Sequence, residues 1–372
     1  MGASRFVPIT NRQHAFAGVS PRVRFCCAAS SDGDGTREID LTAIPALSPD
    51  LRVRLTQWLK ARSEQRSERF PGHSAHFDRF PPITITVPDG YASDYMGNTW
   101  PTHFGFSASP GTYETSLPEV TEEYFEMLDI MEAALDAGRS FTMLEWGAGF
   151  ARWSSFGVGA ARRLGIEDIR IGAVEADPIH LSYVIENMWI MDIPDDRVRL
   201  YPYALSGKTG SDLFVIGAPP VATGAAGGDR WFGQALNDMG GYELGTETYG
   251  GRPVQQNPNG FKAIEIMVEP ASKVLADYDY VDLIDMDLQG AEADVVDESI
   301  DLLNSRVRRL HIGTHGTDIE RRMRETLSAN DWILIRDLPL HAPSSTPFGD
   351  VVCVDGVQSW FNPRFPPPGF AG

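Results

Sequence analysis

The alternation of short apolar segments with helix-like segments after residue 140 is the feature that most constrains the fold of this chain. Strand-like apolar segments are expected at 141–145, 169–175, 198–203, 281–286, 308–312, 332–335 and 350–354. Helix-like periodicity is seen at 119–137, 150–164, 181–191, 291–304 and 318–329. Short apolar strands that alternate with helices predict a mostly parallel sheet covered on both faces. We therefore expect an α/β fold of the Rossmann-like, doubly wound kind.

The regions outside this pattern divide the chain into a leader, an N-terminal extension, a main domain and a tail. We place these parts at residues 1–36, 37–117, 118–356 and 357–372. The leader has no acidic residue before Asp32, which is typical of an organelle transit peptide or of a disordered extension. The N-terminal extension is expected to hold a helix and an aromatic-rich loop. Residues 207–262 are rich in glycine and lack periodicity, so we interpret them as a lid-like or disordered insertion.

The overall charge limits the partners of the chain. It carries 51 acidic and 32 basic residues, with a formal net charge of −19. Such a surface repels nucleic acid and anionic lipid, so we expect neither as a partner. No apolar run approaches the ~20 residues of a membrane helix, and three cysteines do not make a disulfide framework. We expect a cytoplasmic protein, or a plastid or mitochondrial one after removal of the leader; the oligomeric state stays open.

The ends of the first two expected strands carry the residues of a nucleoside site. Glu145 precedes a turn with Gly147 and Gly149, and glycines there allow the backbone to approach a ligand closely. Glu175 ends the next strand, where a carboxylate can accept hydrogen bonds from both ribose hydroxyls. A negative charge at Glu145 suits the cationic sulfonium of S-adenosyl-L-methionine. Alternatively, the glycines only permit close packing of a helix on a strand.

A dinucleotide is the competing ligand, and an NAD-dependent oxidoreductase the competing enzyme. The dinucleotide fingerprint needs a third glycine, at the position that Arg152 occupies here. Glu145 would also oppose the negative pyrophosphate. A non-catalytic binding protein that retains the fold is a further alternative.

The segment from Val281 to Glu292, with the glycine turn and the strand end at Glu175, resembles the FkbM-type methyltransferases. Asp287-Leu-Gln-Gly-Ala-Glu292 is the most specific part, and the similarity runs from about residue 118 to 354. Residues 94–97, 122–126 and 311–315 resemble a bacterial subgroup with an N-terminal extension. The resemblance implies a Rossmann-like seven-stranded sheet, S-adenosyl-L-methionine as methyl donor, and O-methylation of sugars or secondary metabolites. Asp285 departs from the family, because many members have Lys there.

The acceptor site is expected after the fourth and fifth strands of the main domain. Asp287 would lie near both the donor and the acceptor, and His315 or His311 would act as a general base, since imidazole titrates near neutrality. His311, in mid-strand, could instead be a buried, hydrogen-bonded residue. Further candidates for contacts with the acceptor, which we expect to be a small molecule or a glycan, are Gln289, Glu292, Trp231 and Tyr95. Glu292 could instead only stabilise a helix N-terminus, and Tyr95 could belong to a packing cluster.

No metal is expected, but a divalent ion held by Asp285, Asp287 and His315 is an alternative. Such an ion would acidify an acceptor hydroxyl. Linear spacing alone does not decide between the two.

Overall fold

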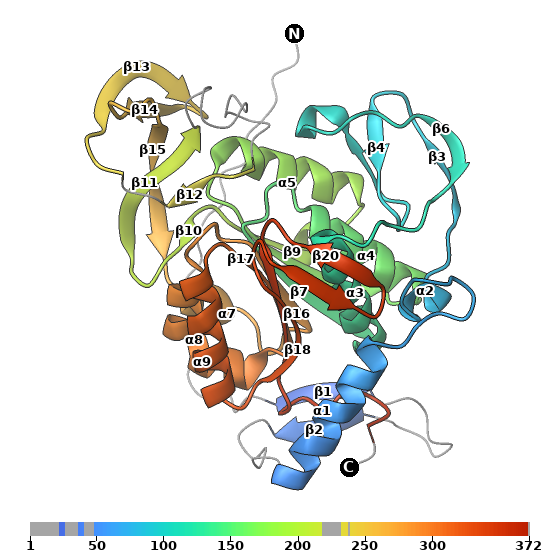
Figure 1. Ribbon diagram of the computed structural model, residues 1–372. Helices are drawn as coiled ribbons and strands as arrows, with labels where there is room; N and C mark the ends of the chain where they lie inside the picture. The colour runs from blue at the N-terminus through green and yellow to red at the C-terminus, as the bar shows by residue number, and fades with distance from the viewer. Residues whose placement is uncertain (1–21, 27–35, 41–47, 218–231, 237–238, 371–372) are drawn as a thin grey trace.

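The computed structural model describes residues 22–26, 36–40, 48–217, 232–236 and 239–370 (Figure 1). Its largest sheet has seven strands in the order β18-β21-β17-β16-β7-β8-β9. They are β7 (Ser140–Trp146), β8 (Asp168–Val174), β9 (Val198–Tyr201), β16 (Leu283–Met286), β17 (Arg309–Thr314), β18 (Ile333–Leu338) and β21 (Gly356–Phe361). β21 runs antiparallel to both of its neighbours, and the other pairs in the sheet are parallel.

Helices cover both faces of this sheet, as the sequence predicts. Side chains along β7 alternate between two cores: Phe141 and Met143 belong to one, Leu144 and Trp146 to the other. The first core includes α3 (Glu122–Asp136), α4 (Arg152–Arg163) and α5 (Pro178–Ile190). The second includes α7 (Ala271–Leu275), α8 (Glu292–Arg306) and α9 (Thr317–Ala329). Figure 1 shows α8 and α9 across the sheet from α3 and α4. The fold is therefore α/β, Rossmann-like and doubly wound.

The last strand of the sheet does not lie where the sequence predicts it. The predicted strand at 350–354 overlaps β20 (Gly349–Val352), which forms a separate hairpin with β19 (Pro343–Thr346). The true seventh strand, β21, falls in the predicted tail. Polar side chains interrupt its apolar pattern, yet Gln358 and Ser359 are buried at 1% and 2% exposure. Both donate hydrogen bonds inside the protein, Gln358 to the Glu320 carbonyl oxygen at 3.1 Å and Ser359 to Asp129. These hydrogen bonds allow the two polar side chains to be buried, although their polarity made this segment look unlike a buried strand in the sequence.

Residues 207–262, expected to be a lid or disordered, are ordered into strands in their described part, and the lid interpretation stays a prediction. This part contributes most of a second, six-stranded sheet. Its strands are β10 (Ala204–Leu205), β11 (Gly210–Gly217), β12 (Ala235–Leu236), β13 (Glu243–Tyr249), β14 (Arg252–Gln256) and β15 (Lys262–Glu269). Gly250 and Gly251, at φ +54° and +78°, join β13 to β14. A two-residue turn with both φ values positive is a favoured hairpin connection, so Gly-Gly was the signal for these strands.

The described part of the N-terminal extension contains two α-helices and two small hairpins and packs on the main domain. Leu55 and Leu59 of α1 (Pro49–Ser63) contact β18 and β21. The remaining elements are α2 (His76–Arg79), β3 (Thr84–Val87) paired with β6 (Gly111–Glu114), and β4 (Tyr91–Ser93) paired with β5 (Thr99–Pro101). β1 (Arg22–Cys26) of the predicted leader pairs with β2 (Thr36–Asp40), which begins at the last residue of the leader and continues into the N-terminal extension; the other residues of the leader lie outside the described ones.

Among the helices of the described residues, none combines the length and the apolar character needed to cross a membrane.

Candidate functional site

A cavity of ≈ 320 Å³ opens at the carboxyl ends of β7, β8, β16 and β17. The strand order reverses beside β7, between β8 on one side and β16 on the other. Ligands of open α/β sheets bind in the crevice at this point. Of the residues predicted for the site, the cavity is lined by Glu145, Gly147, Gly149, Glu175, Asp287, Gln289 and His311.

The glycine turn after β7 is built against the turn after β16. Gly147 has a φ of +85°, and a Cβ atom there would lie 1.8 Å from the carbonyl oxygen of Asp287. Only glycine fits this contact, because no side chain can share that space with a backbone oxygen. The neighbouring Gly149, at φ +56°, donates its backbone N–H to Glu175 Oε2 at 2.6 Å. The two predicted glycines thus shape one wall of the cavity.

Glu145 and Glu175 are buried at 3% and 6% exposure, and both line the cavity. Glu145 Oε2 accepts the backbone N–H of Ser154 at 2.7 Å, in the first turn of α4. Glu175 Oε1 accepts the N–H of Asp177 at 2.7 Å. Burial raises the pKa of each carboxyl to about 8. Since each carboxylate oxygen can accept a second hydrogen bond, both side chains keep capacity for a ligand.

Aromatic rings cover the side of the cavity next to the glycine turn. Phe232 stacks on His180, with ring centroids 4.5 Å apart and planes 17° apart, and both line the cavity. The Phe232 ring lies 3.0 Å from the position that a Cβ of Gly149 would occupy. Trp231, the aromatic residue predicted to contact the acceptor, lies outside the described residues.

His311 lies on the opposite side of the cavity, in β17. Its Nδ1 is 2.7 Å from Asp129 Oδ2, and Asp129 also binds Arg336 and Ser359. A carboxylate at Nδ1 holds the proton on that nitrogen and leaves the lone pair on Nε2. His311 is therefore both buried and hydrogen-bonded, and it keeps one nitrogen for chemistry at the cavity it lines.

His315 is poorly suited to the role of general base that the sequence suggests. Its Nδ1 lies 2.7 Å from Glu292 Oε1, and its Nε2 lies 3.4 Å from Asp287 and 3.5 Å from Asp355. The bond to Glu292 and the nearby carboxylates outweigh burial and raise the pKa of His315 to about 9. A histidine that carries its proton at neutral pH has no lone pair to accept another. His315 also lies outside the lining of the cavity.

Two of the predicted acceptor contacts, Glu292 and Tyr95, lie outside the lining of the cavity, and a third, Gln289, lines it. Glu292 is fully buried, and its Oε1 accepts the N–H groups of Leu288 and Gly290, so it braces the turn after β16. Tyr95 is buried in the core beside α3 and donates to the Phe80 carbonyl oxygen at 2.6 Å. Neither lines the cavity. Gln289 does, with its amide 2.7 Å from Asp287 Oδ1.

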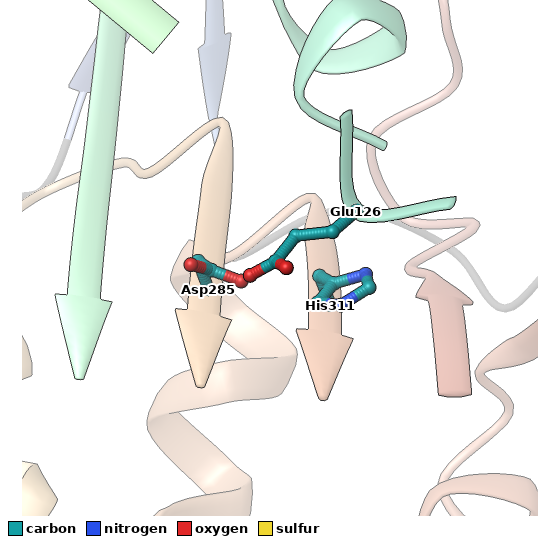
Figure 2. Close-up of side chains that lie close together, drawn as sticks. All are labelled: Glu126, Asp285 and His311. Atoms are coloured by element: carbon teal, nitrogen blue, oxygen red, sulfur yellow. The ribbon is translucent and has the colours of Figure 1, made fainter. Parts of the chain in front are cut away.

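The structure adds one residue that the sequence did not indicate. Glu126 of α3 reaches the end of β16 and lies with Asp285 and His311 in a group whose nearest nitrogen and oxygen atoms are all within 4.8 Å of one another (Figure 2). Asp287, Glu292 and His315 form a separate group. The predicted metal set of Asp285, Asp287 and His315 is therefore divided between two clusters. Glu126 was missed because its helix meets the strand only in the tertiary fold.

Comparison with known proteins gives one curated relative and several solved structures. No protein-family model matches the chain. The relative is named "Putative methyltransferase", comes from Jannaschia sp. (strain CCS1), and is 25% identical over 265 residues, which are 70% of this chain and 84% of that protein. The chain is similar to a methyltransferase. This relative confirms the expected resemblance to methyltransferases.

The solved structures are more distant. The FkbM methyltransferase of Methylobacillus flagellatus KT is 12% identical with a TM-score of 0.35; the match covers 64% of this chain and 53% of that one, about half of its length. The O-methyltransferase of Bacillus cereus, solved in complex with SAH, is 12% identical with a TM-score of 0.34, and the match covers 66% and 82% of the two chains.

Proposed function

We propose that this chain is an S-adenosyl-L-methionine-dependent methyltransferase that methylates a hydroxyl oxygen of a small-molecule or glycan acceptor. The observation that carries the proposal is the cavity at the end of β7, with its tight glycine turn and two buried glutamates. The Jannaschia relative supports the methyl-transfer part. The antiparallel β21 supports it too, because the dinucleotide-binding order 3-2-1-4-5-6 has no such strand.

The residues of the cavity fit the donor in charge and in shape. Gly147 lets the backbone lie close to the ligand, and Glu175 offers its remaining lone pairs to two ribose hydroxyls. The bound donor supplies a methyl carbon made electrophilic by a cationic sulfur. Arg152 lines the cavity but donates to Glu123 at 2.7 and 2.8 Å, so its charge is already matched and is a poor partner for a pyrophosphate. This charge pattern disfavours NAD.

The acceptor side has to align a hydroxyl with the methyl group and remove its proton. A C–O bond forms as the S–C bond breaks, the electron pair stays on sulfur, and the hydroxyl proton is released. We assign this proton chemistry to His311, because it lines the cavity and Asp129 holds its Nδ1, so that its Nε2 is the nitrogen left for the acceptor. Asp287 and Gln289, which line the same end of the cavity, are proposed to contact the acceptor.

Binding of S-adenosylhomocysteine measured by calorimetry tests the donor assignment. Glu175→Ala is expected to weaken binding by about 1–3 kcal/mol, since it removes both ribose contacts and the acceptor of the Gly149 N–H. Glu186→Ala serves as the control, because this exposed carboxylate pairs with His103 outside the cavity. Equal affinity in both variants, or binding of NADH instead, would contradict the assignment.

The pH dependence of donor binding tests whether the charge of the two glutamates attracts the donor. In the empty cavity both carboxyls have a pKa of about 8, so they become neutral as the pH falls below 8. A neutral carboxyl attracts the sulfonium less, and S-adenosylhomocysteine lacks the sulfonium charge. The affinity for S-adenosyl-L-methionine relative to S-adenosylhomocysteine should therefore rise roughly 5- to 50-fold from about pH 6 to about pH 9. A constant ratio would mean that the sulfur lies away from these carboxylates.

A further inference from the structure

One face of α3 carries four acidic residues, and the arginines of the sheet neutralise only three of them. Asp129 binds Arg336, Glu132 binds Arg309 and Arg336, and Asp136 binds Arg309 and Arg62. Glu126, at the cavity end of the face, instead meets Asp285 and His311 (Figure 2). The nearest guanidinium, that of Arg152, donates its hydrogen bonds to Glu123. Among the described residues, no arginine therefore forms an ion pair with Glu126, the acidic residue of α3 at the cavity.

Asp285 adds a second carboxylate at the same place. It is 2% exposed, and its Oδ1 has no hydrogen-bond partner among the described residues. Figure 2 shows its carboxylate turned toward that of Glu126. Burial raises the pKa of Asp285 to about 6, although the contacts with His311 and Glu126 lower it, and burial together with Asp285 raises the pKa of Glu126 well above its usual value. Two carboxylates in contact, that of Asp285 buried and that of Glu126 half-buried, need either a shared proton or a cation between them.

His311 provides the third ligand and is oriented as metal-binding histidines are. Its Nδ1 faces Asp129, itself held by Arg336 and Ser359, so the Nε2 lone pair is free to bind an ion. A carboxylate behind the ligating imidazole is the usual outer partner in such sites. The second cluster differs, because both nitrogens of His315 already lie within hydrogen-bond distance of Glu292 and Gln289.

We propose that Glu126, Asp285 and His311 bind one divalent first-row transition-metal ion at the acceptor end of the cavity. Two carboxylates with one imidazole suit Mn²⁺, Fe²⁺ or Zn²⁺ better than Mg²⁺, which prefers oxygen ligands alone. The three ligand atoms lie within 4.8 Å of one another. Ligands about 2.1 Å from one ion are at most ~4.2 Å apart, so a small closing movement of the side chains completes the site.

A catalytic role for this ion rests on the methyltransferase function proposed above. Placed beside Asp287 and Gln289, it would bind the acceptor hydroxyl and lower the pKa of that group. With the ion present, Nε2 of His311 would be a ligand instead of the proton acceptor, and the acidified hydroxyl would release its proton to solvent.

Metal binding by the full chain tests the inference without any acceptor. Protein stripped with a chelator is dialysed against Mn²⁺ or Zn²⁺, its metal content is measured by plasma mass spectrometry, and the affinity by calorimetry. We expect one ion per chain. Glu126→Gln, Asp285→Asn and His311→Ala should each weaken binding at least ~10-fold. Asp355→Asn removes a carboxylate from the same cavity but not from the cluster, so it should stay within about twofold of wild type.

Thermal unfolding of each variant shows whether the fold is kept, and Glu126→Gln is the safest variant because an amide can donate a hydrogen bond to Asp285. Absence of metal uptake by the wild type would overturn the inference, and so would equal uptake by wild type, Glu126→Gln and Asp285→Asn. S-adenosylhomocysteine binding is measured on the same samples. If the donor binds and the metal does not, only this inference fails; if the metal binds and the donor does not, only the proposed function fails.

Discussion

Replacement of His311 by alanine is expected to lower kcat by about 10²–10⁴-fold and to leave the affinity for S-adenosylhomocysteine within about twofold. The imidazole lies across the cavity from the glycine turn, so its loss removes the proton chemistry but no donor contact. The rate is followed as release of S-adenosylhomocysteine, with an acceptor found by screening hydroxylated small molecules and sugars.

Two variants separate this role from a general effect of histidine loss. His103→Ala removes an exposed histidine that contacts Glu186 on the surface, and its turnover should be that of the wild type. Asp129→Asn keeps the size of the side chain that positions His311 but weakens its hold on the Nδ1 proton. We expect a smaller loss of kcat and a shifted pH–rate profile. Full turnover in His311→Ala would remove this residue from the mechanism.

Replacement of Gly147 by alanine is expected to abolish detectable donor binding, a loss of more than ~100-fold, and to destabilise the protein by about 2–4 kcal/mol. The added methyl group would lie 1.8 Å from the Asp287 carbonyl oxygen, so the turns after β7 and β16 have to separate. These turns form two walls of the cavity. Calorimetry with S-adenosylhomocysteine and urea unfolding measure the two effects.

Gly165 provides a matched control for the backbone conformation alone. It also has a positive φ, +78°, but no atom lies within 4 Å of the position of a Cβ. Gly165→Ala should therefore cost only about 1 kcal/mol and leave donor binding unchanged. If Gly147→Ala were no more harmful than Gly165→Ala, the close contact between the two turns would not exist in solution.

The sequence predicts the parts of the fold that depend on local periodicity. Strands β7, β8 and β16 and helices α3, α8 and α9 lie where their apolar patterns indicate. β21 escaped prediction because Gln358 and Ser359 look exposed in the sequence. Only the tertiary fold supplies their partners, Glu320 and Asp129. Strand pairing in residues 207–262 was not predicted because the many glycines of this segment interrupt its apolar pattern, and the hairpin signal is confined to Gly250-Gly251.

The sequence likewise predicts one part of the candidate site and misses the other. Glu145, Gly147, Gly149 and Glu175 follow consecutive strands of a parallel unit, so their convergence can be derived from the order of the elements. The acceptor side combines α3, β16 and β17 with the turn before β21. The electrostatics of His315 depend on Glu292 and Asp355, which are 23 and 40 positions away in sequence. No spacing rule predicts that these carboxylates surround His315, which is why the sequence favoured His315 over His311 as the general base.

Asp177 ties the donor half of the cavity to the second sheet. Its backbone N–H binds Glu175 Oε1, its Oδ1 caps α5, and its Oδ2 accepts the hydroxyl of Tyr249 at 2.9 Å. On the other side of that contact, a Cβ on Gly250 would overlap Pro178. In a chimera that exchanges the β13–β14 hairpin with that of a relative, we therefore expect the contacts that position Asp177, and through it Glu175, to be disturbed. Grafting of this hairpin has to keep Asp177 and Pro178 together with Tyr249 and Gly250.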